Sequence, residues 1–409
     1  MAKKNKKEAN VPNLRFPEFA GKQNFKKHLF KDIFVFSTGK NIKQSEASSE
    51  FEIPCVRYGE LYHMYGEIIT EVINKTNLNR SELLFSEGDE ILIPSAGEDP
   101  TDIGSASALT VKDVAIGRTI NVLKPAKANI YSQLYVAYYI NHRLKKTISS
   151  LAKGVSISNV YNSDLKTLEI ILPTLDEQNK IVVFLSILDK RIETQNKIIE
   201  DLKLLISGTI STIEKHAKTS SNWRKAFLHE VLLERTEKNK ENYPVHSVSV
   251  SVGVVNQIEY LGRSFAAKNT SNYNVVHEGD IVYTKSPTGE FPYGIIKQSF
   301  VPDKVSVSPL YGVYKPINRW IGNILHYYFL NPINANNYLH SLVQKGAKNT
   351  INISNQGFLM KQLYLPINET DCRKTAELLN VITQKLTIEK MILDKYNAQK
   401  IYILKELFI

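Results

Sequence analysis

The sequence predicts an α/β chain built from two similar halves, each a compact domain followed by one long helix. Three observations predict it. Apolar residues recur at spacings of three, four and seven in residues 173–218, which is typical of a helix with one apolar side. The same pattern returns 194 residues later, in residues 366–409. Between the long segments lie short stretches rich in β-branched and aromatic residues, and these end at Gly, Pro, Asn or Ser as strands do.

Each long helix carries an apolar seam that needs an apolar partner, and the simplest partner is the other helix. A helix of roughly 40 residues is about 60 Å long at 1.5 Å per residue. Thr174 and Glu177 stand three apart at the start of the first helix, which predicts a capping box. A heptad run alone is also typical of a plain strut, and the repeat is what favours a duplicated molecule with pseudo-twofold symmetry. The seam residues are Leu185, Leu188, Ile192, Ile199 and Leu202, then Leu379, Ile382, Leu386 and Leu393.

The repeat extends over the whole of each half. An aromatic residue, two basic residues, an apolar pair and an acidic residue recur in this order at the start of both halves. An acidic-Gly-Asp turn precedes a strand in each half, and we interpret it as turn chemistry without a catalytic role. The matched segments are 24–33 with 222–231, 87–89 with 278–280, 124–125 with 315–316, and 138–141 with 328–331.

Strands are expected at residues 52–58, 90–94, 114–123 and 281–283. The domain boundaries follow from the repeat and from a Thr-Ser-Ser-Asn linker between the halves. They give a flexible N-terminal segment (1–23), a first domain (24–172), a central long helix (173–218), a second domain (219–365) and a C-terminal long helix (366–409).

Composition and charge indicate a folded protein with a polyanionic partner. The chain has 409 residues, enough for two to three domains, and is 43% hydrophobic and 23% charged. Its net charge of +11 favours nucleic acid. Cys55 and Cys372 form neither a metal-binding spacing nor a disulfide framework. No signal peptide or membrane-length apolar stretch is present, so we expect a reducing, cytoplasmic location.

Motifs for the chemistry of DNA modification or cleavage are missing from the sequence. It lacks an Asn-Pro-Pro-aromatic tetrad for adenine methylation, and Asn331-Pro332 is interpreted as a helix breaker. There is no Walker A loop for ATP. Pro302-Asp303 has no downstream acidic-x-Lys partner, and no histidine pair has a zinc-ligand spacing. We therefore expect no catalytic residues, no metal and no cofactor in this chain.

The segment Leu172-Pro-Thr-Leu-Asp-Glu-Gln178, before the first long helix, resembles the LPxLxEQ hallmark of type I restriction-modification specificity (S) subunits. Residues 11–19, the paired openings of the two halves and the second long helix are similar to the same family. The resemblance covers nearly the whole chain. The second copy, Leu365-Pro-Ile-Asn-Glu-Thr-Asp371, departs from the hallmark because it lacks the Glu-Gln pair.

The resemblance implies both an architecture and a role. Members of this family carry two target recognition domains held apart by two antiparallel coiled-coil helices, and each domain recognises one half of a bipartite, asymmetric DNA site. The helices set the unread spacer and dock two methyltransferase (M) subunits, which endonuclease/translocase (R) subunits join. The partners bind S-adenosylmethionine, ATP and Mg. The specificity subunit directs adenine methylation and restriction without being a catalyst.

DNA-contacting side chains are expected in loops, where Lys and Arg bind phosphates and polar or charged side chains distinguish bases. Each half has one such loop after the strand that follows the Gly-Asp turn and another that begins with a Lys-Gly pair. Helix caps and ordinary turns are the alternative interpretation of both loops. The candidates are Lys40, Lys43, Ser95, Glu98, Lys153, Ser156 and Asn159 in the first half and Lys285, Thr288, Glu290, Lys345, Lys348, Asn349 and Asn352 in the second.

Two other classes of function remain open from the sequence. One is a DNA-binding regulatory or architectural protein that acts without methyltransferase partners. The other is a coiled-coil interaction scaffold whose positive charge is incidental. Steep loss of DNA affinity with rising salt would distinguish a phosphate-binding protein from the scaffold.

Overall fold

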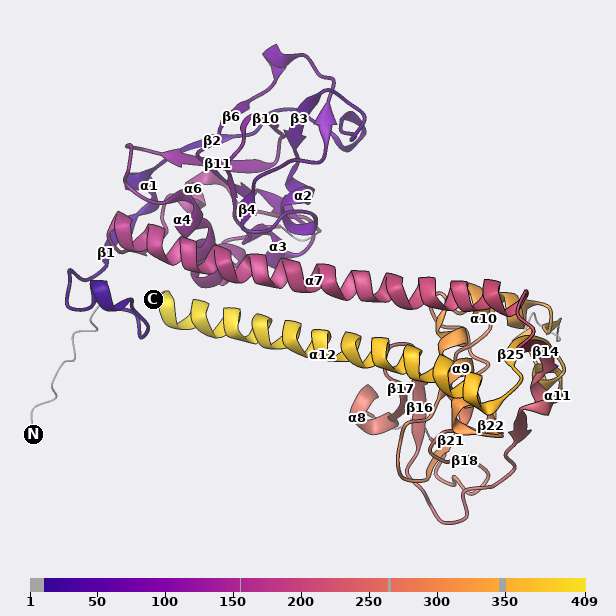
Figure 1. Cartoon of the computed structure of the whole chain (residues 1–409). Helices are drawn as coiled ribbons and strands as arrows, with labels where there is room; N and C mark the ends of the chain where they lie inside the picture. Colours follow the sequence, from indigo (N-terminus) through magenta and orange to yellow (C-terminus); the bar gives the residue numbers. More distant parts are fainter. Residues whose placement is uncertain (1–10, 155, 264–265, 346–350) are drawn as a thin grey trace, which may run out of the picture. The chain divides into compact units, whose positions relative to one another are not determined.

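The computed structural model describes residues 11–154, 156–263, 266–345 and 351–409 (Figure 1). The chain divides into two compact units: unit 1 comprises Met1–Thr194 with Leu393–Ile409, and unit 2 comprises Gln195–Ile392. Both are mixed α/β, which confirms the predicted fold class. Among the described residues, no helix combines the length and the apolar character that crossing a membrane requires.

Two long helices, α7 (Leu175–Ala217) and α12 (Glu369–Leu407), each contribute residues to both units. In unit 1 the start of α7 lies beside the end of α12, where Lys400 pairs with Asp189 at 2.7 Å. In unit 2 the Gln195 side chain donates to the Glu389 backbone carbonyl at 3.0 Å, and Ile210 packs near Leu379. Residues that come later in α7 therefore meet earlier residues of α12, so the helices run antiparallel within unit 2.

The predicted seam side chains are covered to different degrees. Leu185, Leu188, Ile199 and Leu379 are buried, and Ile192, Leu202, Ile382, Leu386 and Leu393 are half-buried. In unit 1, Leu185 and Leu188 share a hydrophobic core with Leu404 and Leu407 of α12 and with apolar residues of the domain. Each fully buried Leu or Ile stabilises the fold by about 1.5–3 kcal/mol, so the seam is a main contributor to packing along the helices.

Unit 1 contains a five-stranded sheet of order β2-β11-β7-β9-β4 and a four-stranded sheet of order β5-β3-β10-β6. Two short antiparallel pairs, β1-β13 and β8-β12, complete it. The strands are β1 Lys26–Leu29, β2 Phe34–Thr38, β3 Ile53–Val56, β4 Ile68–Ile69, β5 Lys75–Thr76, β6 Phe85–Glu87, β7 Glu90–Pro94, β8 Ala96–Gly97, β9 Ser107–Leu109, β10 Lys112–Ile116, β11 Ile120–Pro125, β12 Ser158–Asn159 and β13 Glu169–Leu172. The helices are α1 Phe30–Ile33, α2 Tyr58–His63, α3 Pro100–Ile103, α4 Gln133–Tyr139, α5 Lys145–Ser150 and α6 Asn162–Leu165.

Unit 2 has a four-stranded sheet of order β15-β22-β19-β20 and antiparallel pairs β14-β25, β16-β17, β18-β21 and β23-β24. The strands are β14 Trp223–Phe227, β15 Leu232–Glu234, β16 His246–Ser249, β17 Gly253–Asn256, β18 Asn274–Val276, β19 Ile281–Tyr283, β20 Ile296–Gln298, β21 Val305–Val307, β22 Gly312–Pro316, β23 Gln344–Lys345, β24 Ile351–Asn352 and β25 Gln362–Pro366. The helices are α8 Gln257–Leu261, α9 Arg319–Leu330, α10 Pro332–His340 and α11 Asn355–Leu359.

The strand topology confirms the internal duplication. In unit 1, β11 lies between β2 and β7; in unit 2, β22 lies between β15 and β19. The opening strand of each half pairs with the strand that leads into its long helix, with Lys26 opposite Leu172 in one unit and Trp223 opposite Pro366 in the other. The domain of each unit is thus attached directly to the start of a long helix.

One predicted strand, residues 114–123, is wrong in its continuity. Strand β10 ends at Ile116, and β11 begins at Ile120 after a turn at Gly117. A Cβ on Gly117 would lie 3.0 Å from the Val56 carbonyl oxygen, so the backbones approach closely there. Thr119 has φ +69°, a left-handed value that ends a strand. The β-branched composition predicted the strands, while tertiary packing placed the turn.

The predicted capping box at Thr174 is also wrong. Both carboxylate oxygens of Glu177 accept hydrogen bonds from the Arg15 guanidinium, each at 2.7 Å. The next residue, Gln178, accepts from the Ser132 N–H at 2.8 Å and donates to the Pro173 carbonyl at 3.0 Å. The Glu-Gln pair thus fixes the start of α7 to two other parts of unit 1.

The second copy replaces this arrangement with a simpler one. The Asn368 side chain accepts from the Asp371 N–H at 2.9 Å and caps α12. Cys372, at the position of Gln178, donates its thiol to the Pro366 carbonyl over 3.8 Å. The hydrogen bond from Gln178 to a proline carbonyl therefore has a weak counterpart in unit 2, although the Glu-Gln pair is missing there.

Loss of the Arg15 guanidinium is expected to destabilise unit 1 strongly. The Glu177 side chain is fully buried, and a buried carboxylate without its partner costs about 3 kcal/mol. In Arg15→Met, urea unfolding of the full chain should therefore begin at a clearly lower concentration. Lys27→Met breaks an exposed pair with Glu169 and should change stability by about 0.5 kcal/mol or less. Equal effects of the two substitutions would contradict this role of Arg15.

Candidate nucleic-acid interface

In unit 1 the structure brings the two predicted DNA-contacting loops together. Strand β8 pairs antiparallel with β12, so that Asn159 lies opposite Ala96. The Val160 N–H donates to the Ser95 carbonyl at 3.0 Å and extends this pairing. Ser95 and Asn159 are half-buried at the junction, whereas Glu98, Lys153 and Ser156 are exposed.

The second of these loops is a tight hairpin. Lys153 and Asn159 exchange two backbone hydrogen bonds, at 3.0 and 2.8 Å. Between them Gly154 has φ +134°, and a Cβ there would lie 2.0 Å from the Ile157 carbonyl oxygen, so only glycine fits. The Lys153 ammonium pairs with Asp164 at 2.8 Å. Part of the charge predicted to contact phosphate is therefore neutralised within the unit.

A third loop, residues 39–43, joins the same surface through the turn between β10 and β11. The Arg118 N–H donates to the Asn41 carbonyl at 2.9 Å, and the Ser95 N–H donates to the Thr119 carbonyl at 2.9 Å. Backbone hydrogen bonds thus connect the loop 39–43, the turn 117–119 and the paired strands β8 and β12. We call this connected set the unit 1 loop surface. Lys40 and Lys43 are exposed on its first loop.

The sequence analysis missed Arg118 on this surface and Asn162 in α6, which follows β12. Arg118 is exposed, and no acidic side chain of the described residues forms an ion pair with it. The Asn162 side chain donates to the Ser37 carbonyl at 2.9 Å and ties α6 to the end of β2. The Gly-Arg-Thr sequence at residues 117–119 was the available signal, because it interrupts a β-branched run with a turn-forming residue.

The corresponding residues of unit 2 are arranged differently. Lys285 is half-buried with φ +59°; burial lowers its pKa below the usual value, and nearby Glu234 opposes that shift. Thr288 and Glu290 are exposed, and the Glu290 carbonyl accepts from the Asn336 side chain at 3.1 Å. Lys345 and Asn352 lie on the paired strands β23 and β24, while Lys348 and Asn349 lie outside the described residues.

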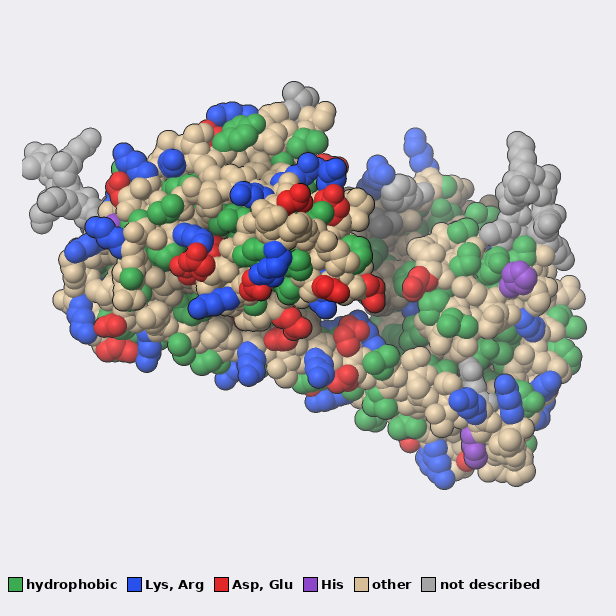
Figure 2. Space-filling model, turned by 90° about the horizontal axis from the view of Figure 1, so that it is seen from above, with side chains coloured by type: hydrophobic (Ala, Val, Ile, Leu, Met, Phe, Trp, Pro, Cys, Tyr) green, Lys and Arg blue, Asp and Glu red, His purple; other side chains and the backbone are tan. Residues whose placement is uncertain are grey.

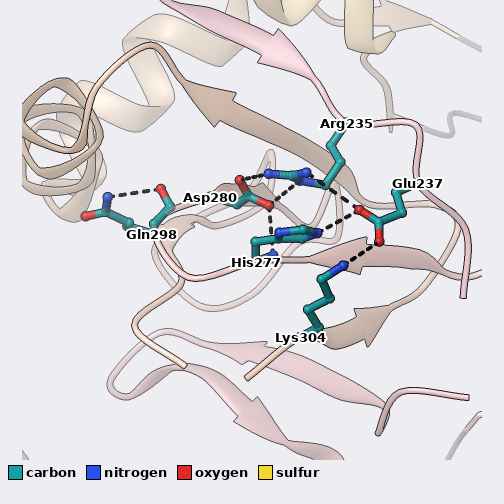
Figure 3. Close-up of polar contacts among 7 residues, drawn as sticks. Arg235, Glu237, His277, Asp280, Gln298 and Lys304 are labelled. Atoms are coloured by element: carbon teal, nitrogen blue, oxygen red, sulfur yellow. Dashed lines mark hydrogen bonds and ion pairs between the residues drawn. The ribbon is translucent and has the colours of Figure 1, made fainter. Parts of the chain in front are cut away.

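A charged network next to β19 uses several basic groups of unit 2 internally (Figure 3). Arg235 binds both oxygens of Asp280, at 2.6 and 2.9 Å. Glu237 accepts from His277 at 2.7 Å and from Lys304 at 3.1 Å. Burial opposes the ionisation of Glu237, but the bonds from His277 and Lys304 hold its pKa below the usual value. Arg235 and Lys304 are paired with carboxylates, so they are poor candidates for binding phosphate.

The same network closes the Glu-Gly-Asp turn of unit 2. The Asp280 carboxylate accepts from the His277 N–H at 2.8 Å, and the Gln298 side chain donates to the Gly279 carbonyl at 3.0 Å. These bonds account for the conformation of the turn. Within the part of the chain that the structure describes, no group of three or more His, Cys, Asp or Glu could hold a metal ion.

On the face drawn in Figure 2, Lys and Arg side chains are mixed with Asp and Glu and are not gathered in one patch. The net charge therefore does not locate a binding surface by itself, and the candidate interface rests on loops in which polar side chains and unpaired cations are held together.

Comparisons with known proteins concern the sequence of the first half and the fold of the whole chain. Residues 22–204 match the family model of the type I restriction modification DNA specificity domain. A putative type I specificity subunit of Mycoplasma pneumoniae is 38% identical over 96 residues, which is 22% of this chain and 24% of that relative. The aligned part thus spans about a quarter of the relative's length.

Solved structures extend the likeness in fold to the rest of the chain. The type I restriction-modification S subunit from M. genitalium has a TM-score of 0.63 at 17% identity, covering 98% of this chain and 99% of that one. A chain from a structure concerned with assembly and conformational transition of the type I R-M system has a TM-score of 0.52 at 12% identity, covering 94% and 97%. Residues 22–204, fewer than half of the chain, thus match the type I specificity domain, and the whole chain shares its fold with a solved type I S subunit.

Proposed function

We propose that this chain is the DNA sequence-specificity subunit of a type I restriction-modification complex, in which the domain of each unit recognises one half of a bipartite, asymmetric site. The observation that carries the proposal is the unit 1 loop surface. There, four segments of the chain are joined by backbone hydrogen bonds and present Lys40, Lys43 and Arg118 together with Ser95 and Asn159. Such a surface combines cations for phosphates with short polar side chains for base edges.

Division of labour on this surface follows from the chemistry of the side chains. Lys40, Lys43 and Arg118 bind phosphates and fix the position of the duplex. Ser95, Glu98, Ser156 and Asn159 face bases, with the acidic group suited to cytosine and the amide to adenine. In unit 2 the corresponding residues are Lys285, Thr288, Glu290, Lys345, Lys348, Asn349 and Asn352. The loops differ between the units in length and residue type, so the two half-sites differ in sequence.

The chemistry belongs to partner subunits under this proposal. Two methyltransferase subunits bind S-adenosylmethionine, and the endonuclease/translocase subunits bind ATP and Mg. Adenine methylation requires the base to leave the stack, and the role of this chain is to place the correct adenine within reach of the methyltransferase. The lack of nucleotide-binding and methylation motifs in the sequence supports a non-catalytic subunit.

The two long helices set the spacer between the half-sites and dock the methyltransferase subunits. The buried part of the seam acts on assembly through the helix pair that it holds together, because side chains such as Leu185 have no exposed surface. Contact with a partner instead involves apolar residues on the outer faces of the helices. In unit 2, Leu204 of α7 is 70% exposed and Val381 of α12 is 64% exposed, and apolar groups displayed in this way are typical of protein interfaces.

Removal of two cations from the unit 1 loop surface should weaken DNA binding by the assembled methyltransferase complex. For Lys40→Ala with Arg118→Ala, the slope of log affinity against log salt should fall by about 2. The matched control is Lys31→Ala with Lys127→Ala, which removes two exposed charges near the other end of β11. The control should keep its slope and most of its affinity. Equal losses in both variants would reject the assigned surface, and absence of any duplex binding would favour the scaffold function.

Charges placed on the outer helix faces should block docking without unfolding the chain. Leu204→Glu with Val381→Glu is expected to lower affinity for the methyltransferase subunit at least tenfold in calorimetric titration, because two apolar contacts become charged. Leu310→Glu, at a 74% exposed position in the loop before β22, is the control and should bind normally. Unchanged binding by the double variant would show that docking uses another surface.

A further inference from the structure

Unit 2 contains an apolar pocket whose described lining includes none of the residues proposed to contact DNA. Its volume is about 440 Å³, and it lies among the end of α7, the start of α12, helix α9 and the strand pair β14-β25. Pockets of this size and apolar character hold drug-sized molecules or a few side chains. The apolar part of its wall includes Ile210, Ile213, Trp223, Leu325, Leu365 and Leu379.

Unit 1, which has the same fold, shows which side chains occupy the region that corresponds to this pocket. The shift of 194 residues pairs Ile210 and Ile213 with Leu404 and Leu407, and the matched segments 328–331 and 138–141 pair Leu325 with Tyr135. In unit 1 these three counterparts belong to one buried core. Phe408 belongs to the same core and packs against Tyr135.

Phe408 is the residue that closes unit 1. It is 1% exposed, and its ring meets the rings of Tyr135 and Tyr139 edge-on, with centroid distances of 5.2 and 5.7 Å. The same shift pairs Phe408 with Glu214 in the sequence. Unit 2 therefore has no aromatic residue at the position that supplies this ring in unit 1.

The rim of the pocket is positively charged. Lys218 and Lys225 are exposed, no ion pair is formed by either among the described residues, and none of the described residues lining the pocket is acidic. The ammonium of Lys361 differs, because it donates to the carbonyls of Asn337 and Tyr338 and to the Ser341 hydroxyl at 2.6–2.8 Å. Two cations at the rim are thus available to an anionic occupant.

We propose that this pocket binds a segment of a partner protein in which a phenylalanine or similar apolar side chain is flanked by carboxylates. The apolar side chain enters the pocket as Phe408 enters the core of unit 1, and the carboxylates pair with Lys218 and Lys225. The lysine-rich first ten residues of this chain have the wrong charge for the same place. The inference is independent of how either unit recognises DNA.

The intrinsic fluorescence of Trp223 gives a direct test. The chain has two tryptophans, so Trp320→Phe leaves only the one that lines the pocket. The probe is a blocked hexapeptide, Glu-Glu-Phe-Phe-Glu-Glu, titrated into the full chain. Its binding should shift Trp223 emission saturably and be at least tenfold tighter than that of Glu-Glu-Ser-Ser-Glu-Glu or Lys-Lys-Phe-Phe-Lys-Lys. No shift at about 1 mM probe, or equal binding of the three peptides, would overturn the proposal.

Two variants link the binding to this pocket. Lys218→Glu with Lys225→Glu changes only exposed side chains and should reverse the preference in favour of the lysine peptide. Thr375→Phe fills the pocket from α12 and should weaken binding of the acidic probe at least tenfold, while Thr370→Phe at an exposed position of the same helix should not. An unchanged preference in the charge-reversed protein would contradict the proposed role of the lysines. Circular dichroism of each variant confirms that it remains folded.

Discussion

Packing between the two long helices, and between each helix and the domain beside it, is the constraint on which the structure depends. In unit 1 the start of α7 and the end of α12 belong to the same core as the domain. In unit 2, Ile210 of α7, Tyr327 of α9 and Leu379 of α12 form a cluster. Each domain is therefore fixed to helices by buried side chains rather than by a flexible linker, and a recognition surface built on such elements keeps its geometry.

Buried polar groups support this packing at the helix starts. The Arg15–Glu177 pair connects the segment before the first domain to α7, and Gln178 connects α7 to the Ser132 N–H just before α4. In unit 2 the Asn368 side chain caps the start of α12, and the Cys372 thiol takes the position of Gln178. The two halves thus share one fold but differ in sequence at the helix starts and in the loops. Packing does not constrain these parts of the two halves in the same way. Another such difference is at Phe408, which the shift of 194 residues pairs with Glu214.

The sequence predicted the elements that follow from periodicity and from the repeat. Both long helices, the strand at residues 90–94 and the duplicated order follow from local patterns that tertiary packing leaves unchanged. The capping box was wrong because the partner of Glu177 is 162 residues away. The strand at residues 114–123 was wrong because the close approach of Gly117 to Val56 is a tertiary feature. Arg118 lies in the turn between β10 and β11, which the sequence analysis interpreted as continuous strand. For this reason Arg118 was not recognised as a candidate DNA contact.

The central claim is that each unit recognises its own half of the DNA site, and the most direct measurement exchanges one unit's domain. Residues 24–172 would be replaced by the corresponding region of a relative, and methylated adenines would be mapped across the genome of cells carrying the exchanged chain. The account predicts that one half of the recognised sequence changes while the other half and the spacer length stay the same. A change in both halves, or a modification pattern that does not depend on this chain, would contradict it.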